Sequence, residues 1–246
     1  MDSSTGSPNH NSLSVGGPPP INFSHDLLCP PDRIGTALTV AGTRSYNQRM
    51  EPYSSFLTWR FDTALQFASG LHHQQARKGV HIPYIAHLMS VCALVIEAGG
   101  DEDQAIAALL HDAVEDQGGL STLDTIRHMF GDRVASTVES CSDSTATDPT
   151  EKPPWRERKV KYLQHLRTAS GDALLVSAAD KLHNARAILA DYRELGEVLW
   201  SRFNAPKEEQ LWYYGALVET LRQTSAPKTL VDELSRVVEE LKRSAK

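Results

Sequence analysis

The sequence predicts an all-α protein. Apolar residues recur every three or four positions from residue 56 onward, as in Phe56, Trp59, Phe67 and Leu71, and this spacing places them on one face of a helix. Glycines and prolines separate the periodic segments, where helices end and begin. No segment shows the apolar–polar alternation of a strand over a convincing length. We therefore expect a bundle of about eight to ten helices.

The first predicted helices precede the acidic part of the chain. One covers residues 56–71, and a turn at residues 79–82 follows it. Pro83 suits the first position of a second helix, because a proline there lacks only an N–H that would be unpaired anyway. This helix is expected to end at Gly99-Gly100.

A third helix is predicted to begin at a capping box. Asp101 and Gln104 have the spacing at which each side chain bonds the backbone N–H of the other. The helix carries the run AIAALLHDAVED and continues to Gly118-Gly119. A fourth helix is expected over residues 121–130, and a fifth over residues 132–141.

The second half of the chain predicts a loop and four more helices. Residues 142–154 are polar and contain prolines, which indicates a loop near the functional site. Pro153-Pro154 then open a helix that runs to residue 166. The other helices are expected from Gly171 through the run LLVSAADKLHNARAIL, over residues 207–223, and over residues 227–243.

The chain divides into three regions. Residues 1–50 are rich in Ser, Gly, Pro and Asn and have little apolar periodicity, so we expect a disordered tail. Residues 51–225 carry the main helical domain, and residues 226–246 a C-terminal helix. Because the patterned sequence begins right after Met50, this methionine is a candidate translation start, which N-terminal sequencing of the native protein would test.

Composition restricts the partners and the compartment. A net charge of −6 argues against general nucleic-acid binding, although a local basic cluster can still hold a phosphorylated small molecule. Cys29, Cys92 and Cys141 form no CxxC pair, which indicates reduced thiols in a cytoplasmic protein and no zinc finger. No apolar stretch approaches the ~20 residues that span a bilayer, so no membrane partner is expected. The sequence does not determine an oligomeric state.

The run ALLHDAVED holds four groups that can bind a metal or transfer a proton: His111, Asp112, Glu115 and Asp116. In one continuous helix, Asp112 and Asp116 share a face, with the other two residues beside them. Acidic groups gathered in this way repel one another and resist burial unless a cation neutralises them. The run therefore predicts a divalent-metal site.

Residues elsewhere in the chain complete this prediction. Taken alone, His87 is a structural histidine on an amphipathic helix, and Asp180 is a surface partner of a neighbouring cation. Taken together with His111-Asp112, they place two imidazoles and two carboxylates on three predicted helices. This mixture of ligands suits Mn²⁺, or a similar ion that keeps positions open for water and substrate.

The order His…His-Asp…Asp resembles the HD superfamily of metal-dependent phosphohydrolases. A narrower resemblance is to the hydrolase domain of RelA/SpoT proteins, above all to the stand-alone small alarmone hydrolases, which include the metazoan SpoT homologues. It rests on the runs QQARKGVHIPYIAH, AALLHDAVEDQGG, FGDRVASTVESCSD, WRERKVKYLQHL and SAADKLHNARAIL. It covers residues 56–222, and the HDxxED and ADKLxN elements make it specific. The resemblance implies an HD-domain helical bundle, with the hydrolase domain over residues 51–225.

The resemblance also implies roles for the residues in these runs. Four of them match the family's metal ligands, which usually hold Mn²⁺: His87, His111, Asp112 and Asp180. Glu115 and Asp116 match the acidic pair that positions and activates the attacking water. A carboxylate can accept a proton from water whose pKa a cation has lowered.

Further positions match substrate contacts in the family. Arg77 and Lys78 match a basic doublet that contacts the nucleotide and its phosphates, where it would offset the negative charge of phosphoryl transfer. Asn184 matches a residue on the ribose side. An aromatic residue of the run WYY, which we take to be Tyr213, is expected near the phosphates.

Two departures from the family pattern concern the nucleotide pocket. Ala86 and Leu88 stand beside His87 where the family often has Asn and Pro, and the segment between Lys78 and Pro83 is slightly short. Neither departure removes a ligand, but both put the base preference in doubt. Three other side chains are assigned from the residues alone. Lys159 and Lys161 are expected on an exposed face and Tyr84 in the core, whereas Trp155 is left open between core packing and base stacking.

We expect a Mn²⁺-dependent hydrolase that removes pyrophosphate from the 3′ position of guanosine tetra- or pentaphosphate, giving GDP or GTP. Adenosine alarmones, (p)ppApp, and another phosphorylated nucleotide such as NADPH remain alternative substrates. The chain after residue 223 leaves no room for a synthetase domain, so degradation of alarmones without synthesis is expected. An alternative of another class is a non-catalytic nucleotide-sensing HD module. The complete set of imidazoles and acids argues against it.

Overall fold

The computed structural model of the protein describes residues 57–142 and 153–246. The predicted tail over residues 1–50, the candidate start at Met50, the thiol of Cys29 and most of the predicted loop 142–154 lie outside these residues. None of the described helices is long and apolar enough to cross a membrane.

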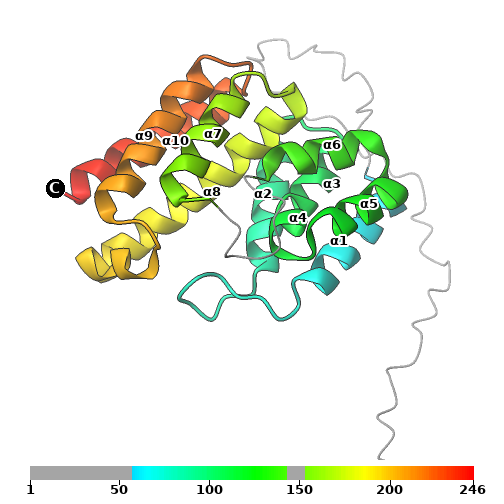
Figure 1. The fold of residues 1–246 in the computed structure, drawn as a ribbon, viewed down its shortest axis with the longest axis horizontal. Coiled ribbons are helices and arrows are strands. Elements are labelled where there is room, and N and C mark those ends of the chain that lie inside the picture. The colour runs from blue at the N-terminus through cyan, green and yellow to red at the C-terminus, as the bar shows by residue number, and fades with distance from the viewer. Residues whose placement is uncertain (1–56, 143–152) are drawn as a thin grey trace, which may run out of the picture. The chain divides into compact units, whose positions relative to one another are not determined.

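Within the described residues the protein is all-α, as predicted. Ten α-helices and one 3-10 helix are present there, and the pairing of Ala76 with Pro83 is an isolated bridge outside any strand (Figure 1). The elements are α1 (Trp59–Leu71), α2 (Ile85–Glu97), α3 (Glu102–Leu110), α4 (Ala113–Asp116), α5 (Gly119–Phe130), α6 (Asp132–Cys141), α7 (Trp155–Leu166), α8 (Gly171–Leu195), η2 (Gly196–Arg202), α9 (Lys207–Arg222) and α10 (Lys228–Ser244).

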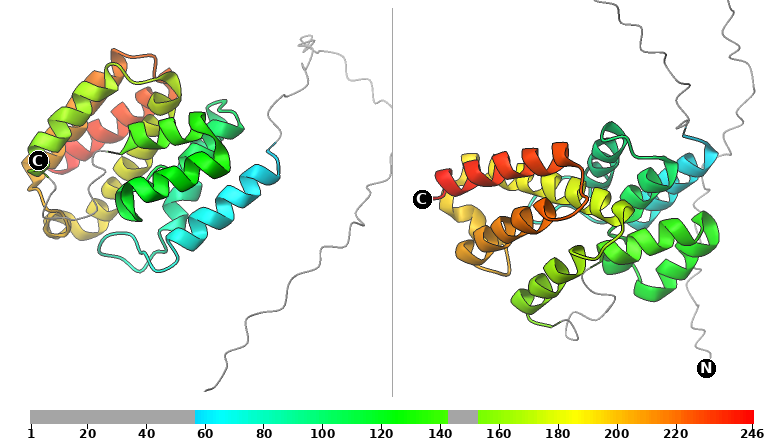
Figure 2. Two further views of the ribbon diagram at one scale, coloured as in Figure 1. Left: turned by 45° about the vertical axis from the view of Figure 1, so that its right-hand side comes forward. Right: turned by 90° about the horizontal axis from the view of Figure 1, so that it is seen from above.

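Helix α8 is the longest element, with 25 residues. Ser170 caps its first turn by accepting a hydrogen bond from the backbone N–H of Ala173, and Gly196, with a φ of 57°, ends it. The helix contacts α2, α3 and α6 as well as α10 and η2. Figures 1 and 2 show α1–α6 gathered on one side of α8, and α7, α9 and α10 on the other. A side chain in the middle of α8 can therefore meet residues from both groups of helices.

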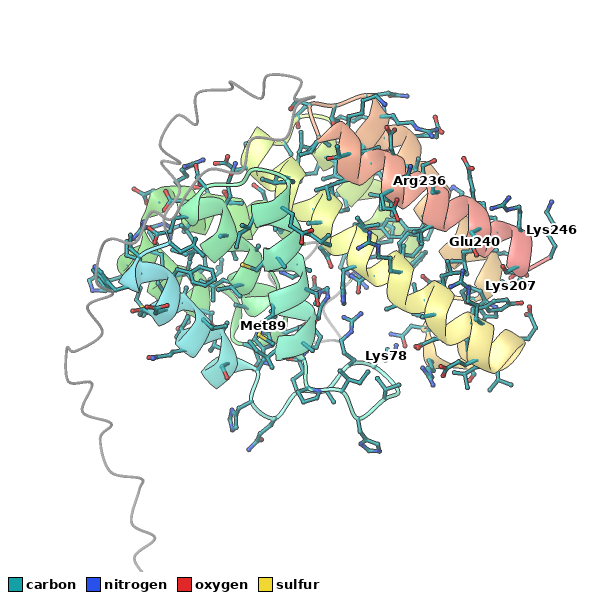
Figure 3. The ribbon with its side chains drawn as sticks, turned by 180° about the vertical axis from the view of Figure 1, so that it is seen from behind. Lys78, Met89, Lys207, Arg236, Glu240 and Lys246 are labelled. Carbon is teal, nitrogen blue, oxygen red and sulfur yellow. The ribbon has the colours of Figure 1, made fainter. Side chains whose placement is uncertain are left out.

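Helix α10 is amphipathic and packs its apolar face against α8 and α9. Leu234, Val238 and Leu241 are buried against the core, whereas Arg236 and Glu240 lie on the outer face (Figure 3). The apolar residues recur at the three- and four-residue spacing of one helix face, so burial of this face attaches α10 to α8.

The predicted third helix is wrong in one respect. Instead of running unbroken to Gly118-Gly119, it stops at Leu110, and α4 begins at Ala113. His111 explains the break, because its Nδ1 lies 2.8 Å from the carbonyl oxygen of Ala108, which a continuous helix would pair with the N–H of Asp112. Asp112 adopts φ −96° and ψ −4°, a sparsely populated conformation that is frequent at active sites.

The C-terminal end of α8 and the segment after it also differ from the prediction. The helix continues to Leu195, beyond the predicted run, and the 3-10 helix η2 was not predicted at all. Its segment, GEVLWSR, lacks a three- or four-residue apolar period, and only Leu199 and Trp200 are buried. Tertiary packing against α8 therefore decides its conformation.

The predicted capping box at the start of α3 is confirmed. The backbone N–H of Gln104 donates to Asp101 Oδ1 at 3.0 Å, and the N–H of Asp101 donates to Gln104 Oε1 at 2.9 Å. The other carboxylate oxygen of Asp101 accepts a hydrogen bond from Arg133 at 2.7 Å. Asp101 thus combines a helix cap with a surface ion pair.

Substitution of Asp101 separates these two contributions. We expect Asp101→Ala to lower the free energy of unfolding by about 1 kcal/mol, because an N–H of the first turn loses its acceptor. Asp101→Asn keeps an acceptor for the cap and should lose only the ion pair, which at the surface is worth a few tenths of a kcal/mol. Urea unfolding of both variants measures the difference. Equal losses would assign the effect to the ion pair and not to the cap.

Candidate metal centre

Three buried side chains from three helices meet at one point. His87 comes from α2, His111 from the residue after α3, and Asp180 from the middle of α8. One ligand atom from each lies within 4.8 Å of the others. The Nε2 atoms of His87 and His111 are 3.2 Å and 3.6 Å from Asp180 Oδ1. Tertiary folding thus brings together residues that are far apart in the sequence.

Both imidazoles turn an unpaired nitrogen toward this point. His111 Nδ1 faces the carbonyl oxygen of Ala108, which can only accept, so Nδ1 carries the proton and Nε2 holds a lone pair. Among the described residues, the buried Nε2 atoms of His87 and His111 have no hydrogen-bond partner of acceptable geometry, although carboxylate oxygens are near. A buried polar atom left unpaired costs about 1–3 kcal/mol, so this arrangement calls for a cation.

The spacing of the atoms also fits a cation. Neighbouring ligand atoms that each lie about 2.1 Å from one ion, at right angles, are about 3 Å apart. The distances from each of the two nitrogens to Asp180 Oδ1 are close to this value. The donor set therefore fits a divalent metal ion on geometric and chemical grounds.

Asp112 adjoins the three residues. Its Oδ2 lies 3.0 Å from His111 Nε2 and 3.5 Å from His87 Nε2, and it accepts a hydrogen bond of 2.6 Å from the Tyr84 hydroxyl. Tyr84 packs against the core, as predicted, and its hydroxyl in addition orients this carboxylate. The second role could not be predicted from the sequence, because the contact joins the residue before α4 to the residue before α2.

The electrostatics of the site keep its carboxylates ionised. Burial by itself would raise the pKa of Asp180, but the ammonium of Lys181 and the two imidazoles outweigh it and hold this pKa well below the ordinary value. Burial opposes the charged form of Asp112 as well, yet the contacts with His111 and His87 together outweigh burial and hold the pKa of Asp112 well below its ordinary value. Both side chains therefore carry the negative charge that a metal ligand needs.

Asp180 is held from several sides. Lys181 Nζ contacts Asp180 Oδ2 at 2.5 Å, which leaves Oδ1 on the side of the imidazoles. Asn184 donates to that Oδ1 at 2.5 Å, and Arg77 in turn donates to Asn184 Oδ1 at 2.6 Å. Asn184 and Arg77, both expected to contact substrate, thus form a chain that ends at the carboxylate of Asp180.

His183 is a part of the site that sequence reasoning missed. Its Nδ1 lies 2.8 Å from Nδ1 of His87, so a proton between them sets the tautomer in which His87 presents the Nε2 lone pair. Burial, with the nearby His87 and Arg77, lowers the pKa of His183 to about 4, which leaves its imidazole neutral and able to accept. The spacing of three residues from Asp180, on the same side of α8, is the signal that could have identified it.

The acidic pair lies on the short helix α4. The backbone N–H of Asp116 donates to the carbonyl oxygen of Asp112 at 3.0 Å, one turn back. Asp116 Oδ2 accepts from Gln75 at 2.8 Å, and Glu115 Oε1 lies 4.0 Å from Arg158. The structure thus places both acids one turn beyond the His111-Asp112 break, and their role in catalysis stays a prediction.

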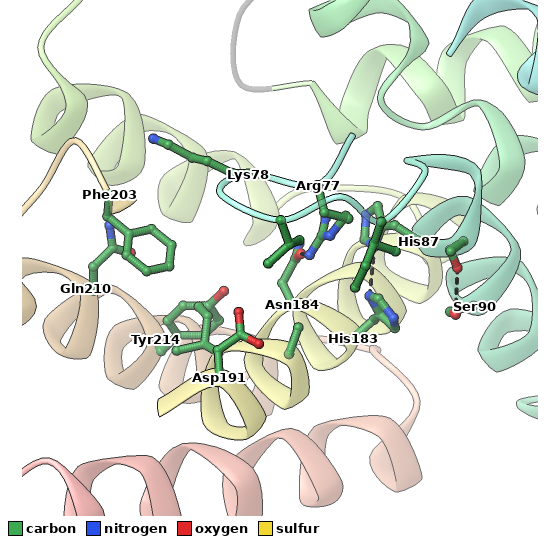
Figure 4. A pocket seen from close by; sticks show the side chains of 15 residues that line it. Arg77, Lys78, His87, Ser90, His183, Asn184, Asp191, Phe203, Gln210 and Tyr214 are labelled. Carbon is green, nitrogen blue, oxygen red and sulfur yellow. Dashed lines mark hydrogen bonds between the residues drawn. The ribbon is translucent and has the colours of Figure 1, made fainter. Parts of the chain in front are cut away.

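A cavity of about 370 Å³ opens beside the centre (Figure 4). Its lining comes from the loop before α2, from α2, α8 and α9, and from the residue after η2: Arg77, Lys78, Val80, Ile82, Ala86, His87, Ser90, His183, Asn184, Ala187, Ile188, Asp191, Phe203, Gln210 and Tyr214. The cavity thus contains His87 together with the predicted contacts Arg77, Lys78 and Asn184. Its size suits a nucleotide.

Tyr213, the aromatic residue predicted to lie near the phosphates, packs against α7. Tyr213 is buried and is not among the residues that line this cavity, whereas its neighbour Tyr214 is. The ring of Tyr213 packs edge-on against Trp155, with Lys159 Nζ 5.2 Å from its centre. Lys159 is accordingly partly buried, in contrast to the exposed Lys161.

Comparison with known proteins agrees with this geometry. The family model described as the HD domain matches residues 64–203, more than half of the chain. The chain belongs to the HD-domain family. The metal cluster of His87, His111 and Asp180 lies inside the matched range and is the feature expected of an HD domain.

Curated relatives within the HD-domain family cover most of the chain. A protein of Xenopus tropicalis named guanosine-3′,5′-bis(diphosphate) 3′-pyrophosphohydrolase MESH1 is 34% identical over 166 residues, which are 66% of this chain and 85% of that protein. The MESH1 protein of Mus musculus is 32% identical over 180 residues, 72% of this chain and 92% of that protein. The chain is thus a homologue of the MESH1 proteins.

A solved structure agrees at the level of the fold. It is described as a metazoan orthologue of SpoT that hydrolyses ppGpp, and it superposes with a TM-score of 0.60 at 26% identity. The match covers 78% of this chain and all of the other chain. The HD-domain bundle predicted from the sequence is thereby confirmed.

Replacement of His183 by leucine should weaken metal binding without removing a ligand. The variant deprives His87 Nδ1 of its partner, and loss of such an outer contact lowers metal affinity about 10- to 100-fold. Isothermal titration with Mn²⁺ measures the change. Ser90→Ala is the matched control, because Ser90 also lines the cavity but bonds only the carbonyl oxygen of Ala86. An unchanged affinity in His183→Leu would show that His87 does not depend on His183.

Proposed function

We propose that this protein hydrolyses guanosine tetra- and pentaphosphate, (p)ppGpp, at the 3′ position and releases pyrophosphate with GDP or GTP. The observation that carries the proposal is the convergence of two unpaired imidazole nitrogens and an ionised aspartate beside a nucleotide-sized cavity. The names of the relatives point to the same reaction, since the MESH1 proteins are named as 3′-pyrophosphohydrolases of guanosine-3′,5′-bis(diphosphate).

Four residues would hold the metal ion: His87, His111, Asp112 and Asp180. Mn²⁺ suits this mixture of nitrogen and oxygen donors better than Mg²⁺, which prefers oxygen ligands throughout. When bound, the ion supplies Lewis-acid polarisation of a phosphoryl oxygen and lowers the pKa of water.

The acidic pair would accept the proton of the attacking water. Glu115 and Asp116 are anchored through Arg158 and Gln75, which would orient their carboxylates toward the reacting phosphorus. Water adds to the phosphorus attached to the ribose 3′ oxygen, and the bond between that phosphorus and the 3′ oxygen breaks. The oxygen leaves as the nucleotide's 3′ hydroxyl after taking up a proton.

Cations of the cavity would bind the negatively charged substrate. Arg77 lies in the cavity at the end of the hydrogen-bonded chain from Asp180, where its guanidinium can offset charge on equatorial phosphoryl oxygens. Lys78 would contact phosphate from the rim of the cavity, and Asn184 the ribose side. The phosphate contact expected of Tyr213 stays a prediction, because Tyr213 does not line this cavity. The partner is thus a small-molecule nucleotide. We place the protein in the cytoplasm, since Cys92 and Cys141 are free thiols.

The double variant Glu115→Gln, Asp116→Asn tests the acidic pair. We expect turnover of ppGpp to fall by about 10²- to 10⁴-fold, the usual contribution of a general base, while Mn²⁺ content stays at the wild-type level. Pyrophosphate release and elemental analysis measure the two quantities. Wild-type turnover in this variant would refute the assignment of the pair.

The metal site is tested by Asp180→Ala together with a chelator. We expect the variant to lose Mn²⁺ and pyrophosphate release, and wild-type protein to lose activity with chelator and regain it with Mn²⁺. Asp232→Ala is the control, because this aspartate pairs with Lys228 within α10 and does not line the cavity. Side-by-side assay of ppGpp, an adenosine alarmone, NADPH and simple nucleotides tests the reaction itself. A wild-type protein inactive on ppGpp with Mn²⁺ would refute the proposed function.

A further inference from the structure

The cavity has two chemically different ends. Arg77, His87 and His183 lie at the metal end, whereas Phe203, Gln210 and Tyr214 lie at the other (Figure 4). One face of α8 forms the floor between them. A substrate held by phosphoryl groups at the metal end must therefore extend its remaining part toward the far end.

Asp191 is the only carboxylate among the residues that line this cavity in the described part of the chain. It stands seven positions, or two helical turns, after Asn184, so both residues are on the same face of α8, with Ala187 and Ile188 between them. The rise of a helix places Asp191 about 16 Å beyond Asp180 along the axis. This length accommodates a cation, a phosphoryl group, a ribose and a base in succession.

One oxygen of Asp191 accepts a hydrogen bond from the protein and keeps a second lone pair, and the other oxygen has both lone pairs available. Arg202 of η2 donates to Asp191 Oδ2 at 2.9 Å, whereas Oδ1 receives no hydrogen bond from the described residues. Arg202 is itself held in place, since its side chain packs so closely on Gly79 that an added Cβ would lie 2.7 Å from Arg202 Cδ. Gly79 also has a φ of +77°, which favours glycine. The ion pair thus fixes the direction of the Asp191 carboxylate.

The surroundings of Asp191 suit a planar heterocycle. Phe203 and Ile188 supply ring and aliphatic surfaces for the faces of a base. Gln210, a residue only 7% exposed, also lines this part of the cavity. Its side-chain amide can donate to or accept from the edge of a base. The far end of the cavity therefore combines apolar walls with polar groups that can bind the edge of a base.

We propose that Asp191 selects guanine by accepting hydrogen bonds from the N1–H and the 2-amino group of the base. The proposal rests on the proposed function and names the base that the site prefers. Guanine presents two adjacent donors on this edge, which match an acceptor-only carboxylate. Adenine presents a lone pair at N1 and no 2-amino group, so its edge repels a carboxylate. The amide of Gln210 can donate or accept after a flip, and Asp191 therefore carries the selection.

Turnover of three related substrates tests the selection. The 3′,5′-bis(diphosphates) of guanosine, inosine and adenosine are compared in wild-type protein and in Asp191→Asn. We expect wild-type kcat/KM to favour guanosine over adenosine by about 10- to 100-fold, the range for a bidentate base contact, with inosine between them. In Asp191→Asn the ratio should approach one, chiefly through loss of guanosine turnover. A variant that keeps the wild-type ratio overturns the proposal.

Two control variants separate the carboxylate from its neighbours. Glu197→Gln removes a carboxylate on η2 that bonds Tyr192 and Lys207 and does not line the cavity. It should keep the wild-type preference. Arg202→Gln removes the ion pair that orients the carboxylate but retains the carboxylate itself, and should weaken the preference less than Asp191→Asn does. If Glu197→Gln abolishes the preference as fully as Asp191→Asn does, the selection does not come from contact of Asp191 with the base.

Equilibrium binding makes the test independent of catalysis. Titration of Mn²⁺-loaded wild-type protein with GDP, IDP and ADP should give affinities in that order, and Asp191→Asn should bind GDP and ADP alike. Inactivity on all three bis(diphosphates) would refute the proposed function, and the titrations would still decide the role of Asp191. Should Asp191→Asn not fold, the comparison of GDP with IDP in wild-type protein tests the contact from the ligand's side. Equal binding of GDP, IDP and ADP to wild-type protein overturns the proposal.

Discussion

The structure depends on one charge, the carboxylate of Asp180 buried in the middle of α8. An isolated ionised carboxylate in a protein interior is too costly to persist, so its surroundings must compensate it. Lys181 contacts one of its oxygens, and Asn184 and two imidazoles surround the other. Because the imidazoles come from α2 and from the end of α3, this compensation fixes α8 against the N-terminal helices. A cation held by the two imidazole nitrogens and this carboxylate would complete the neutralisation.

A local hydrogen bond of His111 helps to form the same metal site. The imidazole of His111 uses the carbonyl oxygen that would continue the helix, and the chain turns so that α3 and α4 are separate. This single contact does two things: it sets the tautomer that leaves Nε2 unprotonated, and it redirects the following residues. The carboxylate of Asp112 then lies against both imidazoles with the Tyr84 hydroxyl behind it, and the acidic pair follows one turn later.

Helix α8 also organises the cavity, from which the functional and specificity arguments both derive. Asp180, Asn184 and Asp191 lie along one helix at spacings that would place the proposed metal, ribose and base contacts in a line. The arrangement needs the helix to extend beyond the predicted run, which ends at Leu189, and α8 does so with its 25 residues. It also needs η2 at its C-terminal end, because Arg202 there orients Asp191. The proposed chemistry and base selection would thus both rest on one helix that the residues of the metal site hold in place.

The sequence by itself determined the helical fold class, the capping box at Asp101, and the identity of His87, His111 and Asp180 as residues of one cluster. These follow from periodicity, from short-range hydrogen bonds and from motifs whose residue types carry their chemistry. The break after Leu110, the contact of His183 with His87, the bond from Tyr84 to Asp112 and the conformation of η2 were decided only by the tertiary structure. Each of these joins residues across helices, or sets a local hydrogen bond against a regular one, and neither outcome can be read from spacing along a single chain.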